Sequence, residues 1–146
     1  MKRLIKRLLL SLLLISLTVC ATKENLKVNF PQEIESISFE KWTGGRSEAG
    51  SGTTITIEFK KQLSKNIHLE KIYFQNQETE IIQENETKYR ASFHSNALYR
   101  EQHSSDAASK NFNLKDNEAV IEYQNHKKTY FYKCSNIKEI PMIMYE

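Results

Sequence analysis

The sequence predicts an all-β fold: a single antiparallel β-sandwich of about seven strands that follows a cleaved N-terminal signal segment. Apolar residues recur with period two over most of the chain after residue 32, and they are largely the β-branched and aromatic types that suit a half-buried sheet. Polar turns separate these segments at hairpin distances. Short strands at this spacing favour a sandwich, with an incomplete barrel as the second architecture.

The N-terminal residues have the composition of an export signal. A basic head leads into an apolar block from Leu8 to Val19, and this block is shorter than the roughly 20 residues that a membrane-spanning helix needs. Cys20 follows directly. We therefore expect a lipoprotein-type signal peptide over residues 1–19 and acylation of Cys20.

Two cleavage reactions compete at this junction. Leu17 and Thr18 suit a lipobox, whereas Val19 stands where that motif has Gly, Ala or Ser. Cleavage after Ala21 by ordinary signal peptidase is the alternative, and it would release a soluble secreted protein. In the favoured interpretation the lipid holds the protein at the bacterial cell envelope, either periplasmic or surface-exposed, and residues 20–32 form a tether.

Removal of the signal also changes the net charge. The whole chain carries +3, but the leader holds four basic residues and no acidic one, so the mature chain carries −1. The remaining lysines are interleaved with glutamates, and we expect no nucleic-acid binding. Cys134 has no partner once Cys20 is acylated or removed, so stability must come from packing rather than from a disulfide.

The β-sandwich domain is expected to span residues 33–146. Its clearest strand is 53–60, where Ile55, Ile57 and Phe59 alternate with polar residues, so that one face is core and the other is solvent. The other expected strands are 33–42, 67–75, 79–84, 88–94, 118–124 and 128–134. The residues expected on inner sheet faces are Trp42, Ile55, Ile57, Phe59, Tyr89, Phe93, Ile121 and Tyr123.

Trp42 has two interpretations. It could stack on a ligand, but a lone Trp in a β domain is more often a core anchor because of the large area it buries. A core position for both Phe39 and Trp42 requires the core face to switch between them, and we expect a bulge there.

Two segments interrupt the alternation. Residues 95–117 are long and polar, and would hold either a short helix over 97–102 or another edge strand. Residues 44–52 contain all four glycines of the chain, which permit close backbone approach to an anion. The residues of this candidate ligand-binding loop are Gly44, Gly45, Arg46, Gly50 and Gly52.

The glycine segment does not match a phosphate-binding loop. Ser51 and Gly52 stand where that motif requires Lys and then Ser or Thr, and a following helix is not expected. A flexible connector between two strands is the favoured interpretation.

The candidate residues for catalysis and metal binding are few. Glu101, His103 and Asp106 would serve a small hydrolase or carbohydrate-active module, but neighbours in one loop rarely converge in space. The four histidines are His68, His94, His103 and His126, with no pair at metal-ligand spacing. We expect no metal, no cofactor and a non-enzymatic binding or structural role, with the membrane, another envelope protein or a surface ligand as partner.

Several segments resemble uncharacterised small bacterial lipoproteins. They are the leader with Cys20, Phe39–Trp42 with the following Gly-Ser-Gly52, Lys71–Phe74, Asn117–Tyr123 and Asn136–Met142. The run Phe112–Glu118, leading into a strand with Tyr123, is similar to the corner before a late strand in bacterial immunoglobulin-like domains. The resemblance implies an immunoglobulin-like sandwich and a lipid anchor, and it carries no activity.

Overall fold

The computed structural model describes residues 26–44, 50–95 and 112–145. The expected signal peptide over 1–19, Cys20 and the segment 101–106 lie outside these residues. These residues contain no helix, so the structure offers no helix that is long and apolar enough to span a membrane.

The described residues form ten strands rather than about seven. The strands are β1 (Leu26–Lys27), β2 (Ile34–Gly44), β3 (Ser51–Phe59), β4 (Ile67–Phe74), β5 (Gln77–Glu80), β6 (Ile82–Gln83), β7 (Lys88–His94), β8 (Ala119–Asn125), β9 (Lys128–Cys134) and β10 (Lys138–Tyr145). The expected strand at 79–84 is split between β5 and β6, while β1 and β10 were not expected.

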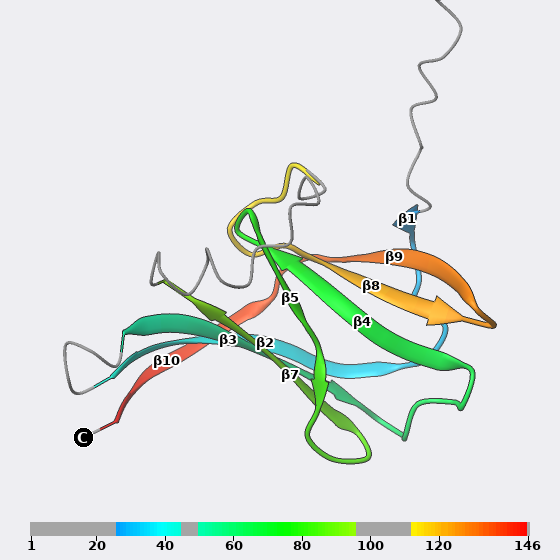
Figure 1. Ribbon diagram of the computed structural model, residues 1–146, viewed down its shortest axis with the longest axis horizontal. Helices are drawn as coiled ribbons and strands as arrows, with labels where there is room; N and C mark the ends of the chain where they lie inside the picture. Colours follow the sequence, from blue (N-terminus) through cyan, green and yellow to red (C-terminus); the bar gives the residue numbers. More distant parts are fainter. Residues whose placement is uncertain (1–25, 45–49, 96–111, 146) are drawn as a thin grey trace, which may run out of the picture.

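The strands form two five-stranded sheets, which favours the sandwich over the incomplete barrel (Figure 1). Sheet A has the order β1-β9-β8-β4-β5, and sheet B has the order β10-β2-β3-β7-β6. Most pairs are antiparallel, as expected, but β1 pairs with β9 and β10 pairs with β2 in parallel. A single extended segment leaves sheet A as β5 and joins sheet B as β6, with the Ile81 amide donating to the Glu70 carbonyl at 3.0 Å between them.

One core lies between the two sheets. Ile55, Ile57 and Phe59 of β3 are at most 1% exposed, as the alternation of that strand predicts. Phe39 of sheet B contacts Phe74 of sheet A, with ring centroids 5.2 Å apart. Of the eight residues expected in the core, seven are buried, and only Trp42 is not.

The part of the expected tether that the structure describes packs on the domain. Leu26 and Lys27 pair with Phe131 and Tyr132 of β9. Phe30 joins the core, and its ring lies 4.7 Å from the ring of Tyr123.

A second apolar cluster lies on the outer face of sheet A. Tyr73, Val120 and Phe131 point away from the main core, and Phe112 and Leu114 pack over them. Phe131 is 6% exposed and Val120 is fully buried. The residues just before β8 therefore cover part of this outer face.

Candidate functional site

The strand register places Trp42 on the outer face of sheet B, which corrects the expected core position. β2 pairs with β3 without interruption from Ser36 to Thr43, so Phe39 and Trp42 face opposite sides of the sheet. The expected bulge between these two residues is therefore absent from β2. An extra residue lies instead in β10, between Ile140 and Ile143, where Pro141 needs no ladder partner for its nitrogen.

Gly52 is the reason that Trp42 can lie on this face. The two residues are direct partners across β2 and β3. A Cβ added at Gly52 would lie 2.6 Å from Cζ2 and 2.8 Å from Cε2 of the indole, and 2.1 Å from the carbonyl oxygen of Phe93. The indole therefore covers the glycine, an arrangement that shields the backbone and stabilises such a position in a sheet.

The third member of this row is His94 on β7, the partner of Gly52 on its other side. The rings of Trp42 and His94 meet edge to face, with centroids 5.3 Å apart and an interplanar angle of 80°. Both side chains are half-buried. The contact fixes the orientation of the indole.

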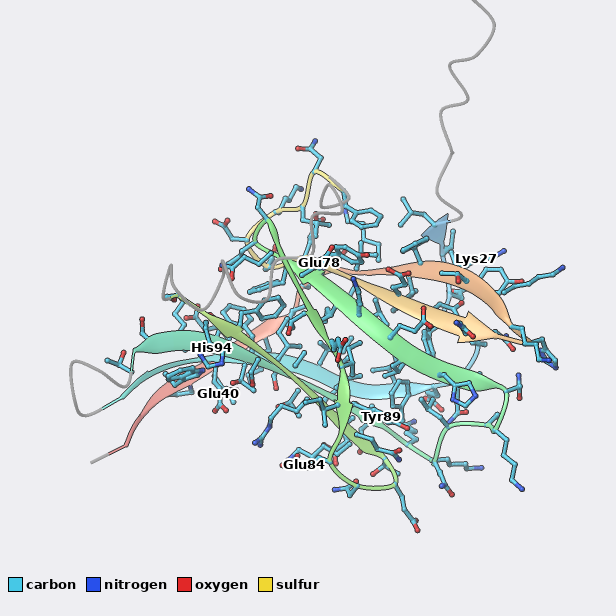
Figure 2. The ribbon with its side chains drawn as sticks, viewed as in Figure 1. Lys27, Glu40, Glu78, Glu84, Tyr89 and His94 are labelled. Carbon is cyan, nitrogen blue, oxygen red and sulfur yellow. The ribbon has the colours of Figure 1, made fainter. Side chains whose placement is uncertain are left out.

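Polar groups form the adjoining row on the same face. Glu40, Thr54 and Ser92 are register partners across β2, β3 and β7, and the hydroxyls of Thr54 and Ser92 lie 3.4 Å apart. Figure 2 shows Glu40 and His94 on the same part of sheet B. We call the six residues of these two rows the Trp42 platform: Glu40, Trp42, Gly52, Thr54, Ser92 and His94.

The glycine segment is shorter as a loop than the sequence indicates. Gly44 ends β2, and Gly52 lies inside β3. The amide of Gly44 donates to the carbonyl of Gly50 at 2.9 Å, and Gly50 has a φ of +72°, a conformation that glycine adopts without strain. Gly45 and Arg46 lie outside the described residues, so the anion-binding interpretation of this loop stays a prediction.

The described histidines and Cys134 do not form one cluster, and His103 lies outside the described residues. His126 belongs to the turn after β8, where its amide donates to the carbonyl of Asn66. Among the described residues no group of three His, Cys, Asp or Glu side chains could hold a metal ion. Burial raises the pKa of the Cys134 thiol to about 12, so this group is not a nucleophile near neutral pH.

A shallow hollow near the start of β2 has few polar groups left to bind a ligand. It is lined in part by Phe30, Gln32 and Tyr132. The amide of Gln32 is occupied, because it donates to the carbonyls of Lys61 and Gln62 and accepts from the backbone of Ser64. The Gln32 side chain therefore holds the loop after β3 in place.

The charged residues on the outer face of sheet A form ion pairs with one another rather than a candidate binding site. Glu118 lies 2.8 Å from Lys133, and hydrogen bonds from Lys133 and from the amide of Lys115 lower the pKa of its carboxyl. Lys71 lies 2.9 Å from Glu78 at the edge with β5, and that hydrogen bond raises the pKa of Lys71. These charges are paired within the face and rim the apolar cluster.

Comparison with known proteins gives no match to a family model, to a curated protein or to a solved structure. Of the described residues, those of the Trp42 platform combine an oriented aromatic ring with polar side chains on an outer face. Trp42, His94 and Gly52 were each named from the sequence, but the sequence did not predict that His94 and Gly52 lie against Trp42. The signal that could have found them is a glycine among alternating β-branched residues, which marks a close approach in a strand.

Proposed function

We propose that this protein is a non-enzymatic binding protein of the bacterial cell envelope, with an immunoglobulin-like domain that holds its ligand on the Trp42 platform. The strand order supports the immunoglobulin-like relationship. β2-β3-β7-β6 follow the A-B-E-D order of that fold, and β9-β8-β4-β5 follow G-F-C-C′. β10 and the parallel β1 are additions, and the inter-sheet disulfide of antibody domains has no counterpart among the described residues.

The envelope assignment rests on the leader and on the shape of the domain. The leader favours acylation of Cys20, with secretion after cleavage at Ala21 as the alternative. Residue 26, the first described, lies at one end of the domain, and the ends of β2 and β3 that carry Trp42 and Gly52 lie at the other (Figure 1). An anchored chain would therefore present the platform away from the membrane.

The observation that carries the binding role is the seating of Trp42 on Gly52. The indole covers the glycine, and its ring meets the ring of His94 edge to face. Glu40 and Ser92 offer a carboxylate and a hydroxyl in the next row, and Thr54 between them is buried, with its hydroxyl 3.4 Å from that of Ser92. An aromatic face beside hydrogen-bonding groups suits a sugar ring, whose C–H face packs on the indole while its hydroxyls bind the polar groups.

Tryptophan fluorescence tests this proposal directly, because Trp42 is the single tryptophan of the chain. Titration with oligosaccharides released from envelope polysaccharides should change the emission of the wild-type protein. Calorimetry should then show binding lost in Trp42→Ala, partly kept in Trp42→Phe, and unchanged in Lys115→Gln, in the segment before β8.

Two outcomes would contradict the proposal. One is an emission that no saccharide changes. The other is a protein partner, captured from native membranes, that Trp42→Ala retains as well as the wild type does.

A further inference from the structure

We propose that the end of the domain where the described chain begins is a docking surface for an anionic lipid membrane. Three segments build this end: residues 26–35, the β3–β4 loop at 60–66, and the β8–β9 turn at 125–128. We call it the basic end. The inference concerns a surface remote from the Trp42 platform, and it does not require that Cys20 is acylated.

Hydrogen bonds hold the three segments together. The amide of His126 donates to the carbonyl of Asn66 at 3.2 Å, and the Asn66 side chain donates to Oδ1 of Asn125 at 2.6 Å. On the other side, the amide of Lys60 donates to the carbonyl of Glu33. β1, the β8–β9 turn and the β3–β4 loop lie at the same end in Figure 1, and Figure 2 places Lys27 there.

Positive charge dominates this end. It carries six lysines and two glutamates, Glu33 and Glu35, which leaves a net charge of +4 on a mature chain whose overall charge is −1. The six lysines are Lys27, Lys60, Lys61, Lys65, Lys127 and Lys128, and all of them are exposed. Because the charge of the mature chain as a whole has the opposite sign, this end carries a local excess of positive charge.

Most of this charge is not neutralised within the protein. Lys60 is paired with Glu33 at 2.5 Å, and the hydrogen bond that Lys60 donates to this carboxylate raises the pKa of Lys60. No ion pair among the described residues involves Lys61, Lys65, Lys127 or Lys128. Lys27 extends over the ring of Tyr130, with its Nζ 5.0 Å from the ring centroid. These lysines are available to an anionic partner.

Exposed apolar side chains lie beside the lysines. Among the described residues only three large apolar side chains are strongly exposed, and two of them, Leu26 at 48% and Val28 at 91%, flank Lys27. A nucleic acid or a soluble polyanion would use the charge but not the apolar groups. A bilayer uses both, since lysines bind its anionic headgroups while apolar side chains enter the boundary with the acyl chains.

Vesicle binding of the mature Cys20→Ser chain tests the inference, because this variant has no acyl chain. We expect binding to vesicles of phosphatidylcholine mixed with phosphatidylglycerol, no binding to phosphatidylcholine alone, and loss of binding at high salt. Each lysine near an anionic surface contributes about fivefold to partitioning. Lys61→Gln with Lys127→Gln should therefore weaken binding more than tenfold.

Matched controls separate this surface from the rest of the protein. Lys115→Gln with Lys138→Gln removes the same charge outside the basic end and should bind as the parent does. Trp42→Ala should also leave vesicle binding unchanged, so a failure of the platform and a failure of the basic end are distinguishable. Equal binding to both vesicle types, equal loss in both double variants, or binding only to a soluble polyanion would overturn the inference.

Discussion

The outer faces of the two sheets differ in composition and in whether another segment covers them. On sheet A the outward residues Tyr73, Val120 and Phe131 are apolar, and the chain before β8 returns over them. On sheet B the outward residues of the central strand β3 are Gly52, Thr54, Thr56 and Glu58, next to Trp42 on β2. The outer face of sheet A therefore forms a second, smaller apolar cluster, whereas the outer face of sheet B carries the Trp42 ring among polar side chains. Alternation tells which residues share a face, but not whether a later segment covers that face.

Phe131→Ala and Trp42→Ala test this difference. Phe131→Ala is expected to have the largest effect on the free energy of unfolding. Phe131→Ala should lower the free energy of unfolding by about 3 kcal/mol or more, as for a buried aromatic residue, although it lies outside the main core. Trp42→Ala should cost less, about 1 to 2 kcal/mol, because the indole is only half-buried. Urea denaturation of both variants measures the two losses. Equal losses would show that the outer face of sheet B is as enclosed as that of sheet A.

Gly52→Ala tests how the platform is built. The new methyl group would meet the Phe93 carbonyl and the indole at distances that no Cβ tolerates, so the strands must shift. We expect a loss of about 2 to 3 kcal/mol, the upper part of the range for overpacking, with a change in Trp42 emission. Thr56→Ala, on the same strand and face, is the control and should cost well under this amount. A Gly52→Ala protein as stable as the wild type would mean that the indole does not rest on the glycine.

The smallest effect is expected at the hairpin turns of sheet A, far from the platform. His126 and Lys127 have φ values of +50° and +63°, and Gln75 and Asn76 form the equivalent turn between β4 and β5. Lys127→Gly should raise the free energy of unfolding by about 0.5 to 1 kcal/mol, because glycine adopts this conformation without strain. Asn76→Gly should gain less, since Asn tolerates positive φ better than Lys does. A thermal melt of each variant measures the gain, and a destabilised Lys127→Gly would show that the lysine side chain supports the turn.

The sequence predicts the inner strands of this fold well and its edges poorly. β3, β7 and β8 were expected within one or two residues, because β3 and β7 each have one buried and one polar face and β8 is a short apolar run that ends at a polar turn. β1 is too short to have a period, and β10 contains Pro141 and a bulge, so neither alternates. Strand order and parallel pairing depend on contacts between distant residues, which a local pattern does not contain.

The candidate site was predicted only in part for the same reason. Trp42 was identified, but its burial was inferred from its size, and only the pairing of β2 with β3 determines its face. His94 joins the site from a third strand, 52 residues further along the chain. Four glycines within nine residues predict a loop. Gly52 instead lies in β3, where the absence of a side chain leaves room for the Trp42 indole.

The pairing of the first two strands with the last two affects the order in which the chain can fold. β1 has its partner in β9, and β2 has one of its two partners in β10, so both edges close only when the C-terminal residues arrive. During synthesis or transport from the N-terminus onwards, more than a hundred residues must emerge before β1 meets Phe131. Contacts of such long sequence separation form slowly, which keeps the nascent chain open for longer. If the leader exports this chain as proposed, crossing the membrane unfolded would benefit from this delay, because the fold would be completed only after the last strand had passed through.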